Sequence, residues 1–220
     1  ADKILPVYCF DPYYFKTTPS GTLKTGAFRA KFLIESVANL RDNLRRLGSD
    51  LIVRIGSPIE IIPQLAIEYH VNEVYHHREV AFEETGISEQ VEAALWKIKL
   101  NLKHFIGHTM YHKEDLPFPI KDIPDSFATF RKKIERDSSV RTIVPVPDHI
   151  NTPPITDAGE IPDLEQLGLT EPSTDLRDQF NFIGGETAAH ELLKQYFINA
   201  GAAACGTSIR NATSGSQLSP

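Results

Sequence analysis

Three histidines, His104, His108 and His112, are spaced four residues apart, as metal ligands on one face of an α-helix would be. The surrounding sequence instead predicts a strand followed by a loop, where this spacing does not bring side chains together. His76 and His77 are neighbours at the end of another predicted strand, so their side chains face opposite sides. The sequence therefore predicts no metal site at these histidines.

The segment Gly56-Ser57-Pro58 lies between a predicted strand and a predicted helix, where backbone N–H groups could bind a phosphate. It lacks the glycine patterns of dinucleotide-binding and ATP-binding loops. A capping box made by Ser57 and Glu60 explains the same residues. An adenine-nucleotide-binding α/β domain stays open as an alternative.

Two charged residues occupy positions where a ligand could bind. Arg29 lies in the first turn of a long predicted helix, and Glu79 follows the third predicted strand. Both are expected on the carboxyl-end side of a parallel sheet, where open α/β sheets bind ligands. Each alone is also typical of a surface residue. Spacing assembles no catalytic triad, Cys-His pair or carboxylate pair, so no catalytic residue is predicted.

The elements that position these residues follow from hydrophobic periodicity. Short apolar runs predict strands at residues 4–10, 51–55, 71–77 and 102–106. Amphipathic segments predict a helix between each consecutive pair of strands. This alternation is typical of an α/β fold with a doubly wound parallel sheet and right-handed crossovers.

Composition excludes several classes of protein. The 220 residues include 29 acidic and 23 basic side chains, a formal net charge of −6, which argues against a surface that binds nucleic acid throughout. No apolar stretch approaches the roughly 18 residues of a membrane span. Two cysteines, Cys9 and Cys205, suggest no disulfide framework. We therefore expect a cytoplasmic protein without a membrane partner.

The second half of the chain changes character. Residues 144–172 contain six prolines and six acidic residues but no Lys or Arg, which predicts an extended connector over a surface. Fourteen of the last 22 residues are Ala, Gly, Ser or Thr, so we expect disorder or an aberrant end there. The predicted divisions are an α/β domain at 1–143, a connector at 144–183, the start of a helical domain at 184–198 and a tail at 199–220.

Several segments, in this order, resemble the N-terminal antenna-domain half of photolyases and cryptochromes, most closely cryptochrome DASH. The resemblance extends from about residue 4 to about residue 198. The segment at 109–118 is typical of the DASH branch. The matching segments are residues 5–12, 24–36, 40–44, 104–118, 130–132 and Gly184-Gly185-Glu186-Thr187.

The resemblance implies a light-driven flavoprotein. Members of the family carry a C-terminal helical domain whose FAD, excited by blue light, donates an electron to a cyclobutane pyrimidine dimer in DNA. DASH members are similar to photolyases that prefer single-stranded DNA and often carry a 5,10-methenyltetrahydrofolate antenna. The folate-contacting carboxylate of the family falls on Glu79, and Arg29 more loosely matches a position near the antenna pocket.

The chain departs from the family at both ends. Its only methionine is Met110, and Ala1 precedes what resembles the second strand of the family, so the central first strand and its R-x-D-L-R motif are expected to be absent. Buried backbone groups without partners cost about 1–3 kcal/mol each, so we expect a weakened, interrupted sheet.

After Ile198 the family's flavin-binding pattern gives way to the small-residue tail, which we expect to be out of frame or foreign. The sequence thus predicts a fragment of a cryptochrome DASH or photolyase that is inactive alone. A signalling cryptochrome without catalysis is the other alternative. Four basic residues could contact DNA phosphates, although a solvated helix face is favoured; they are Arg131, Lys132, Lys133 and Arg136.

Overall fold

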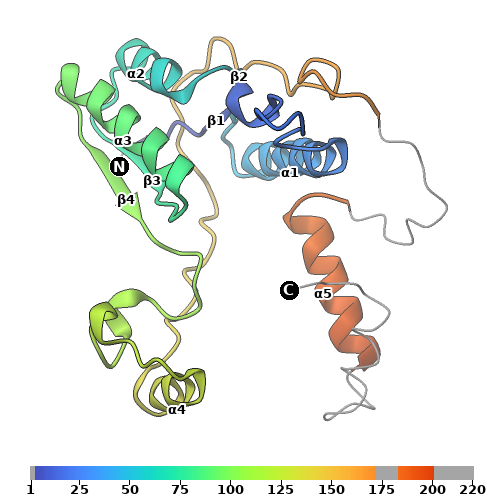
Figure 1. Cartoon of the computed structure of the whole chain (residues 1–220). Coiled ribbons are helices and arrows are strands. Elements are labelled where there is room, and N and C mark those ends of the chain that lie inside the picture. Colours follow the sequence, from blue (N-terminus) through green and yellow to red (C-terminus); the bar gives the residue numbers. More distant parts are fainter. Residues whose placement is uncertain (1–2, 172–182, 201–220) are drawn as a thin grey trace. The chain divides into compact units, whose positions relative to one another are not determined.

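The structure is a computed structural model that describes residues 3–171 and 183–200 (Figure 1). The chain divides into two compact units, residues 1–57 with 148–220 and residues 58–147. Each unit is an α/β arrangement with one pair of parallel strands.

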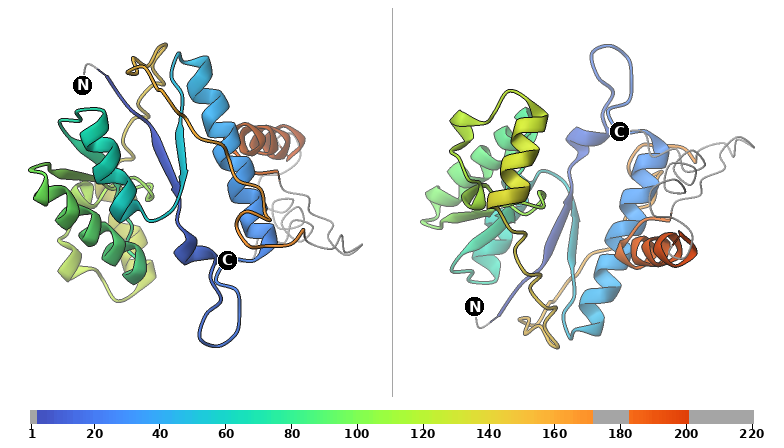
Figure 2. Two further views of the ribbon diagram at one scale, coloured as in Figure 1. Left: turned by 90° about the horizontal axis from the view of Figure 1, so that it is seen from above. Right: turned by 90° about the horizontal axis from the view of Figure 1, so that it is seen from below.

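The first unit is built on a parallel pair of strands and a long helix. Strand β1 (Val7–Phe10) pairs with β2 (Ile52–Ile55), and α1 (Ala27–Arg46) connects them. Figure 2 shows α1 alongside this pair. The helix ends before Gly48, whose φ of +81° is a left-handed conformation that favours glycine and stops the helix.

The connector contributes to the core of this unit. Leu164, Leu167 and Leu169 are buried against apolar side chains of β1, α1 and β2. The backbone N–H of Val53 donates to Ala158 O at 2.8 Å, so the connector also binds β2. The sequence analysis predicted a segment over a surface and missed this contribution, since the leucines follow neither a helical nor a strand period.

A charged network fastens the same segment. The guanidinium of the buried Arg41 donates to Asp50 at 2.8 Å and to the carbonyl oxygen of Gly159 at 2.8 Å. Partial burial opposes ionisation of Asp50, but hydrogen bonds from Arg41, the Leu51 N–H and Arg45 lower its pKa to about 2. Asp50 therefore remains ionised at neutral pH.

The last described helix, α5 (Glu186–Ala200), also belongs to the first unit. It follows the Gly184-Gly185 pair, as the sequence predicted, and contacts α1. Its outward side chains include Leu192, Leu193 and Phe197, all more than half exposed.

The second unit consists of alternating helices and strands that are consecutive in the sequence. Strand β3 (Val74–His77) pairs in parallel with β4 (Leu102–Phe105), and α2 (Pro58–Glu68) packs against α3 (Phe82–Lys97). The buried side chains of its core are Ala66, Val91, Leu95 and Leu102. Short helices η2 (Lys113–Asp115) and η3 (Ile120–Asp122) and helix α4 (Phe127–Asp137) follow.

The predicted fold class is confirmed: the fold is α/β with parallel strands and helical crossovers. In the described part of the chain, β1 pairs only with β2, and β3 only with β4. The sequence analysis expected an interrupted sheet, and two strand pairs are observed in place of one four-stranded sheet. None of the described helices is long and apolar enough to cross a membrane.

Candidate functional site

Glu79 lies at the carboxyl end of β3, in the second unit. Its carboxylate is about half exposed, and Oε1 lies 3.8 Å from Nδ1 of His77. The backbone N–H of Gly107, which follows β4, donates to Nε2 of His77 at 2.8 Å. Because Nε2 accepts this bond, a neutral His77 carries its proton on Nδ1, the nitrogen that faces Glu79.

The imidazole of His108 lies beside His77 at the same end of the strand pair. Nδ1 of His108 lies 3.3 Å from Nε2 of His77, and the two rings meet edge to face with centroids 5.0 Å apart. Glu79 is thus an exposed hydrogen-bond acceptor beside an N–H donor, at the edge where parallel α/β sheets bind ligands. Such a carboxylate can accept hydrogen bonds from N–H groups of a polar ring.

The sheet face beside this edge carries aromatic side chains. Tyr75 and Phe105 stack with ring centroids 5.8 Å apart and an interplanar angle of 21°. Both rings are exposed, because they alternate with the side chains that face the core. The ammonium of Lys103 lies 5.6 Å from the Tyr75 ring and 2.6 Å from Glu73. This face could support a planar ligand that extends from Glu79.

His76 and His104 lie on the opposite face of β3 and β4. Nε2 of His76 is 2.7 Å from Nδ1 of His104, and the hydroxyl of Ser88 in α3 is 3.2 Å from the same Nε2. Burial, and then the neighbouring His104, lowers the pKa of His76. The sequence analysis placed His76 and His77 on opposite faces, and the structure shows them so.

Arg29 is exposed in the first turn of α1 and belongs to the first unit. No hydrogen bond or ion pair of its side chain occurs within residues 3–171 and 183–200. Arg29 and Glu79 are therefore separate candidate contacts, one in each unit, and their common role in an antenna pocket stays a prediction.

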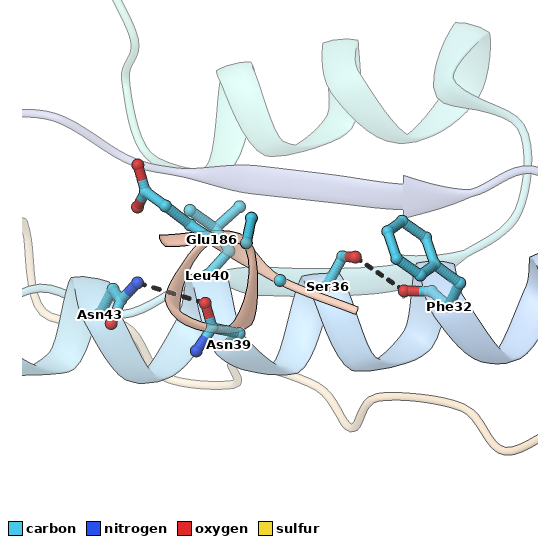
Figure 3. A pocket seen from close by; sticks show the side chains of 8 residues that line it. Phe32, Ser36, Asn39, Leu40, Asn43 and Glu186 are labelled. Carbon is cyan, nitrogen blue, oxygen red and sulfur yellow. Dashed lines mark hydrogen bonds between the residues drawn. The ribbon is translucent and has the colours of Figure 1, made fainter. Parts of the chain in front are cut away.

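A cavity of about 240 Å³ lies between α1 and α5 in the first unit (Figure 3). Its lining is mostly apolar, with Asn39 and Asn43 joined by a hydrogen bond of 3.4 Å on the α1 side. The lining residues are Phe32, Ser36, Asn39, Leu40, Asn43, Gly185, Glu186 and Ala189. This volume is below the roughly 300–1,000 Å³ of typical ligand pockets.

Side chains of α1 hold the start of α5 beside this cavity. The backbone N–H of Thr187 donates to Oδ1 of Asn39 at 3.2 Å, and Nδ2 of Asn39 donates to the Thr187 hydroxyl at 2.9 Å. The carboxylate of Glu35 accepts from the Gly184 N–H at 2.7 Å. Asn39 therefore caps α5 from another helix, satisfying an N–H group that has no partner within its own helix.

Sequence reasoning missed this cap. Glu35 and Asn39 lie four residues apart on α1 and are 149 and 148 residues from their partners Gly184 and Thr187. The available signal was the Gly184-Gly185 pair, because adjacent glycines before a helix can indicate close approach of another backbone.

The structure also bears on the phosphate loop at Gly56 and on the histidines considered as metal ligands. The Gly56 N–H donates to Phe10 O at 3.0 Å, so it is occupied within the fold and is not free for a phosphate. Within the described residues, no group of three or more His, Cys, Asp or Glu side chains could hold a metal ion. His112 precedes the short helix η2 and caps it, because its side chain accepts a hydrogen bond from the Glu114 N–H.

Comparison with known proteins identifies the family. Residues 1–150 match the DNA photolyase family. The chain belongs to this family. Among photolyase-family relatives, cryptochrome DASH of Gloeobacter violaceus is 45% identical over 195 residues, which cover 89% of this chain and 39% of that protein. Cryptochrome DASH of Danio rerio is 39% identical and covers all of this chain and 43% of that protein.

Solved structures of the photolyase family agree. The cryptochrome of Synechocystis sp. PCC6803 has a TM-score of 0.83 and 37% identity, covering 90% of this chain and 41% of that one. A photolyase of Sulfolobus tokodaii, solved with two FAD molecules, shares the fold with a TM-score of 0.64 and 20% identity, covering 88% of this chain and 40% of that one. The chain spans about two fifths of the length of these relatives.

Proposed function

We propose that this chain is the antenna-domain part of a cryptochrome DASH, a blue-light flavoprotein that repairs cyclobutane pyrimidine dimers with a preference for single-stranded DNA. The observation that carries this proposal is the 45% identity to a cryptochrome DASH over 89% of the chain. The parallel α/β fold supports it, since the relatives share that fold.

FAD is assigned to the part of the whole protein that this chain does not span. The cavity of about 240 Å³ between α1 and α5 is too small for a dinucleotide. We therefore assign the electron-transfer step of repair, which needs the excited flavin, to that same part of the whole protein. Accordingly, FAD added to the purified chain should leave no bound, oxidised-flavin absorption after gel filtration.

Glu79 is the proposed hydrogen-bond acceptor for a 5,10-methenyltetrahydrofolate antenna. Three features support it: the carboxylate is exposed, it lies at the carboxyl end of β3, and Nδ1 of His77 lies 3.8 Å from its Oε1. When bound, the folate absorbs light and passes the energy to a flavin. The role of this chain is to bind and orient it.

Replacing Glu79→Gln in the whole protein tests this assignment. We expect at least a tenfold loss of folate affinity, because a charge-assisted hydrogen bond is lost, while FAD content is unchanged. Folate absorption after gel filtration measures the loss. Glu89→Gln, an exposed carboxylate of α3 in the same unit, is the control. Equal folate retention by both variants would exclude Glu79 as a contact.

A signalling photoreceptor is the second candidate. The blue-light photoreceptor PHR2 of Arabidopsis thaliana is 40% identical over 88% of this chain. A protein named as a photoreceptor is therefore nearly as similar to this chain as the cryptochrome DASH relatives are. Light-dependent repair of a dimer-containing single strand by the whole protein separates the two candidates. Repair with multiple turnovers supports a photolyase, and flavin photoreduction without repair supports a receptor.

A further inference from the structure

Two imidazoles join three elements of the second unit at one point. His76 of β3 and His104 of β4 are partners in the register of the strands, with Nε2 and Nδ1 2.7 Å apart. Their rings meet edge to face with centroids 4.9 Å apart. The hydroxyl of Ser88, from α3, lies 3.2 Å from the same Nε2. Loss of this contact would therefore loosen β3, β4 and α3 together.

The contact depends on the number of protons that the pair holds. A hydrogen bond between two nitrogens needs one donor and one acceptor, and a neutral imidazole has one of each. An imidazolium has two donors and no acceptor. When both rings are protonated, two N–H groups face each other at a 2.7 Å separation and two positive charges repel. The observed contact therefore requires a single proton between the two nitrogens, and a second proton there would break it.

The groups around His76 and His104 do not neutralise the two positive charges that the rings would carry if both were protonated. Burial, His104 and Arg78 disfavour protonation of His76, whereas a hydrogen bond with the His77 backbone and the charge of Glu92 in α3 favour it. The core that α2 contributes alongside consists of apolar side chains such as Ile59 and Ile62. The balance lowers the pKa of His76 below that of a solvated histidine.

We propose that His76, His104 and Ser88 form an acid-sensitive latch in the second unit. The latch is closed while at least one ring is neutral, because a single proton then lies between Nε2 of His76 and Nδ1 of His104. It opens when both rings are protonated. This inference concerns the stability of the unit and is independent of photochemistry and of antenna binding.

The test is urea unfolding of the 220-residue chain at pH values from 7.5 to 5, followed by tryptophan fluorescence. Trp96, the only tryptophan, lies in α3 and reports this unit. The folded pair resists a second proton that unfolded histidines accept near pH 6.5, so stability is lost as the pH falls below that value. We expect the unfolding constant to rise about tenfold for each unit by which the second pKa is depressed.

The variant His104→Asn places an amide near the position of Nδ1 and cannot take the second proton. We expect it to flatten the pH dependence. The control His70→Asn removes another histidine of the unit at a φ of 50°, a conformation that asparagine tolerates. Wild-type pH dependence in His104→Asn, or its loss in His70→Asn, would overturn the latch.

Should His104→Asn fail to fold, NMR of the histidine ring signals in the unaltered chain decides the matter. We expect the titration midpoint of His76 to lie below that of a solvated histidine, because its ring is partly buried and contacts His104. Titration of His76 at or above about pH 6.5 would refute the proposal.

Discussion

The two units reach a packed core by different routes. In the first unit, β1, α1 and β2 are completed by leucines of the connector that lie more than 100 residues further along the chain. In the second unit, the core comes from α2, β3, α3 and β4, which are consecutive in the sequence. The first unit therefore depends on a distant segment, whereas the second depends on local crossovers and on a hydrogen-bonded histidine pair.

The comparison predicts that truncating a connector leucine affects the first unit alone. Leu164→Ala should destabilise this unit by about 2–4 kcal/mol, because Leu164 is buried and its removal leaves a cavity. Hydrogen exchange of β1 and α1 amides measures the loss, and Trp96 fluorescence reports the second unit. Leu23→Ala, an exposed leucine of the first unit, is the control. If the Trp96 transition shifted equally, the two units would unfold as one and the comparison would fail.

A smaller effect is expected at the charged network of the first unit. Arg41→Met should cost about 2–3 kcal/mol, since it removes the donor to Gly159 O and leaves Asp50 with Arg45 as its remaining ion-pair partner. Exchange of the Val53 amide, which donates to Ala158 of the connector, gives a local measure. Arg46→Met removes an exposed guanidinium of the same helix as a control. Unchanged protection of Val53 in Arg41→Met would show that the connector is held without Arg41.

The smallest effect is expected at the cap of α5. Asn39→Ala should destabilise the first turn of this helix by about 1 kcal/mol, because the Thr187 N–H loses its acceptor. Faster exchange of the Thr187 amide measures it. Asn43→Ala, one turn along α1 and bonded to Asn39 and Arg46, is the matched control. Similar exchange rates in the two variants would mean that packing, rather than the cap, positions α5.

Much of the fold followed from the sequence because its signals are local. The alternation of apolar runs and amphipathic segments located each strand of both pairs to within a few residues. The resemblance to photolyases and cryptochrome DASH is confirmed by the family match together with the cryptochrome DASH relatives.

The remaining features depend on contacts that no local pattern encodes. Leu164 and Leu167 look like loop residues between prolines and acids, and only their packing on β1, α1 and β2 makes them core. The His76–His104 contact requires the register of β3 against β4, which residue spacing alone does not supply. The proposed role of Glu79 rests on the resemblance, and the structure adds that Nδ1 of His77 lies 3.8 Å from its carboxylate.

The close approach of α1 to the glycine pair has an evolutionary consequence. A β-carbon on Gly184 would lie 2.1 Å from the carbonyl oxygen of Phe32, and one on Gly185 would lie 2.6 Å from Cβ of Asn39. Neither glycine can therefore drift to another residue unless the facing turn of the helix shifts as well. Substitutions at Gly184 or Gly185 should therefore be accompanied by substitutions in the facing turn of α1, although the two stretches are nearly 150 residues apart.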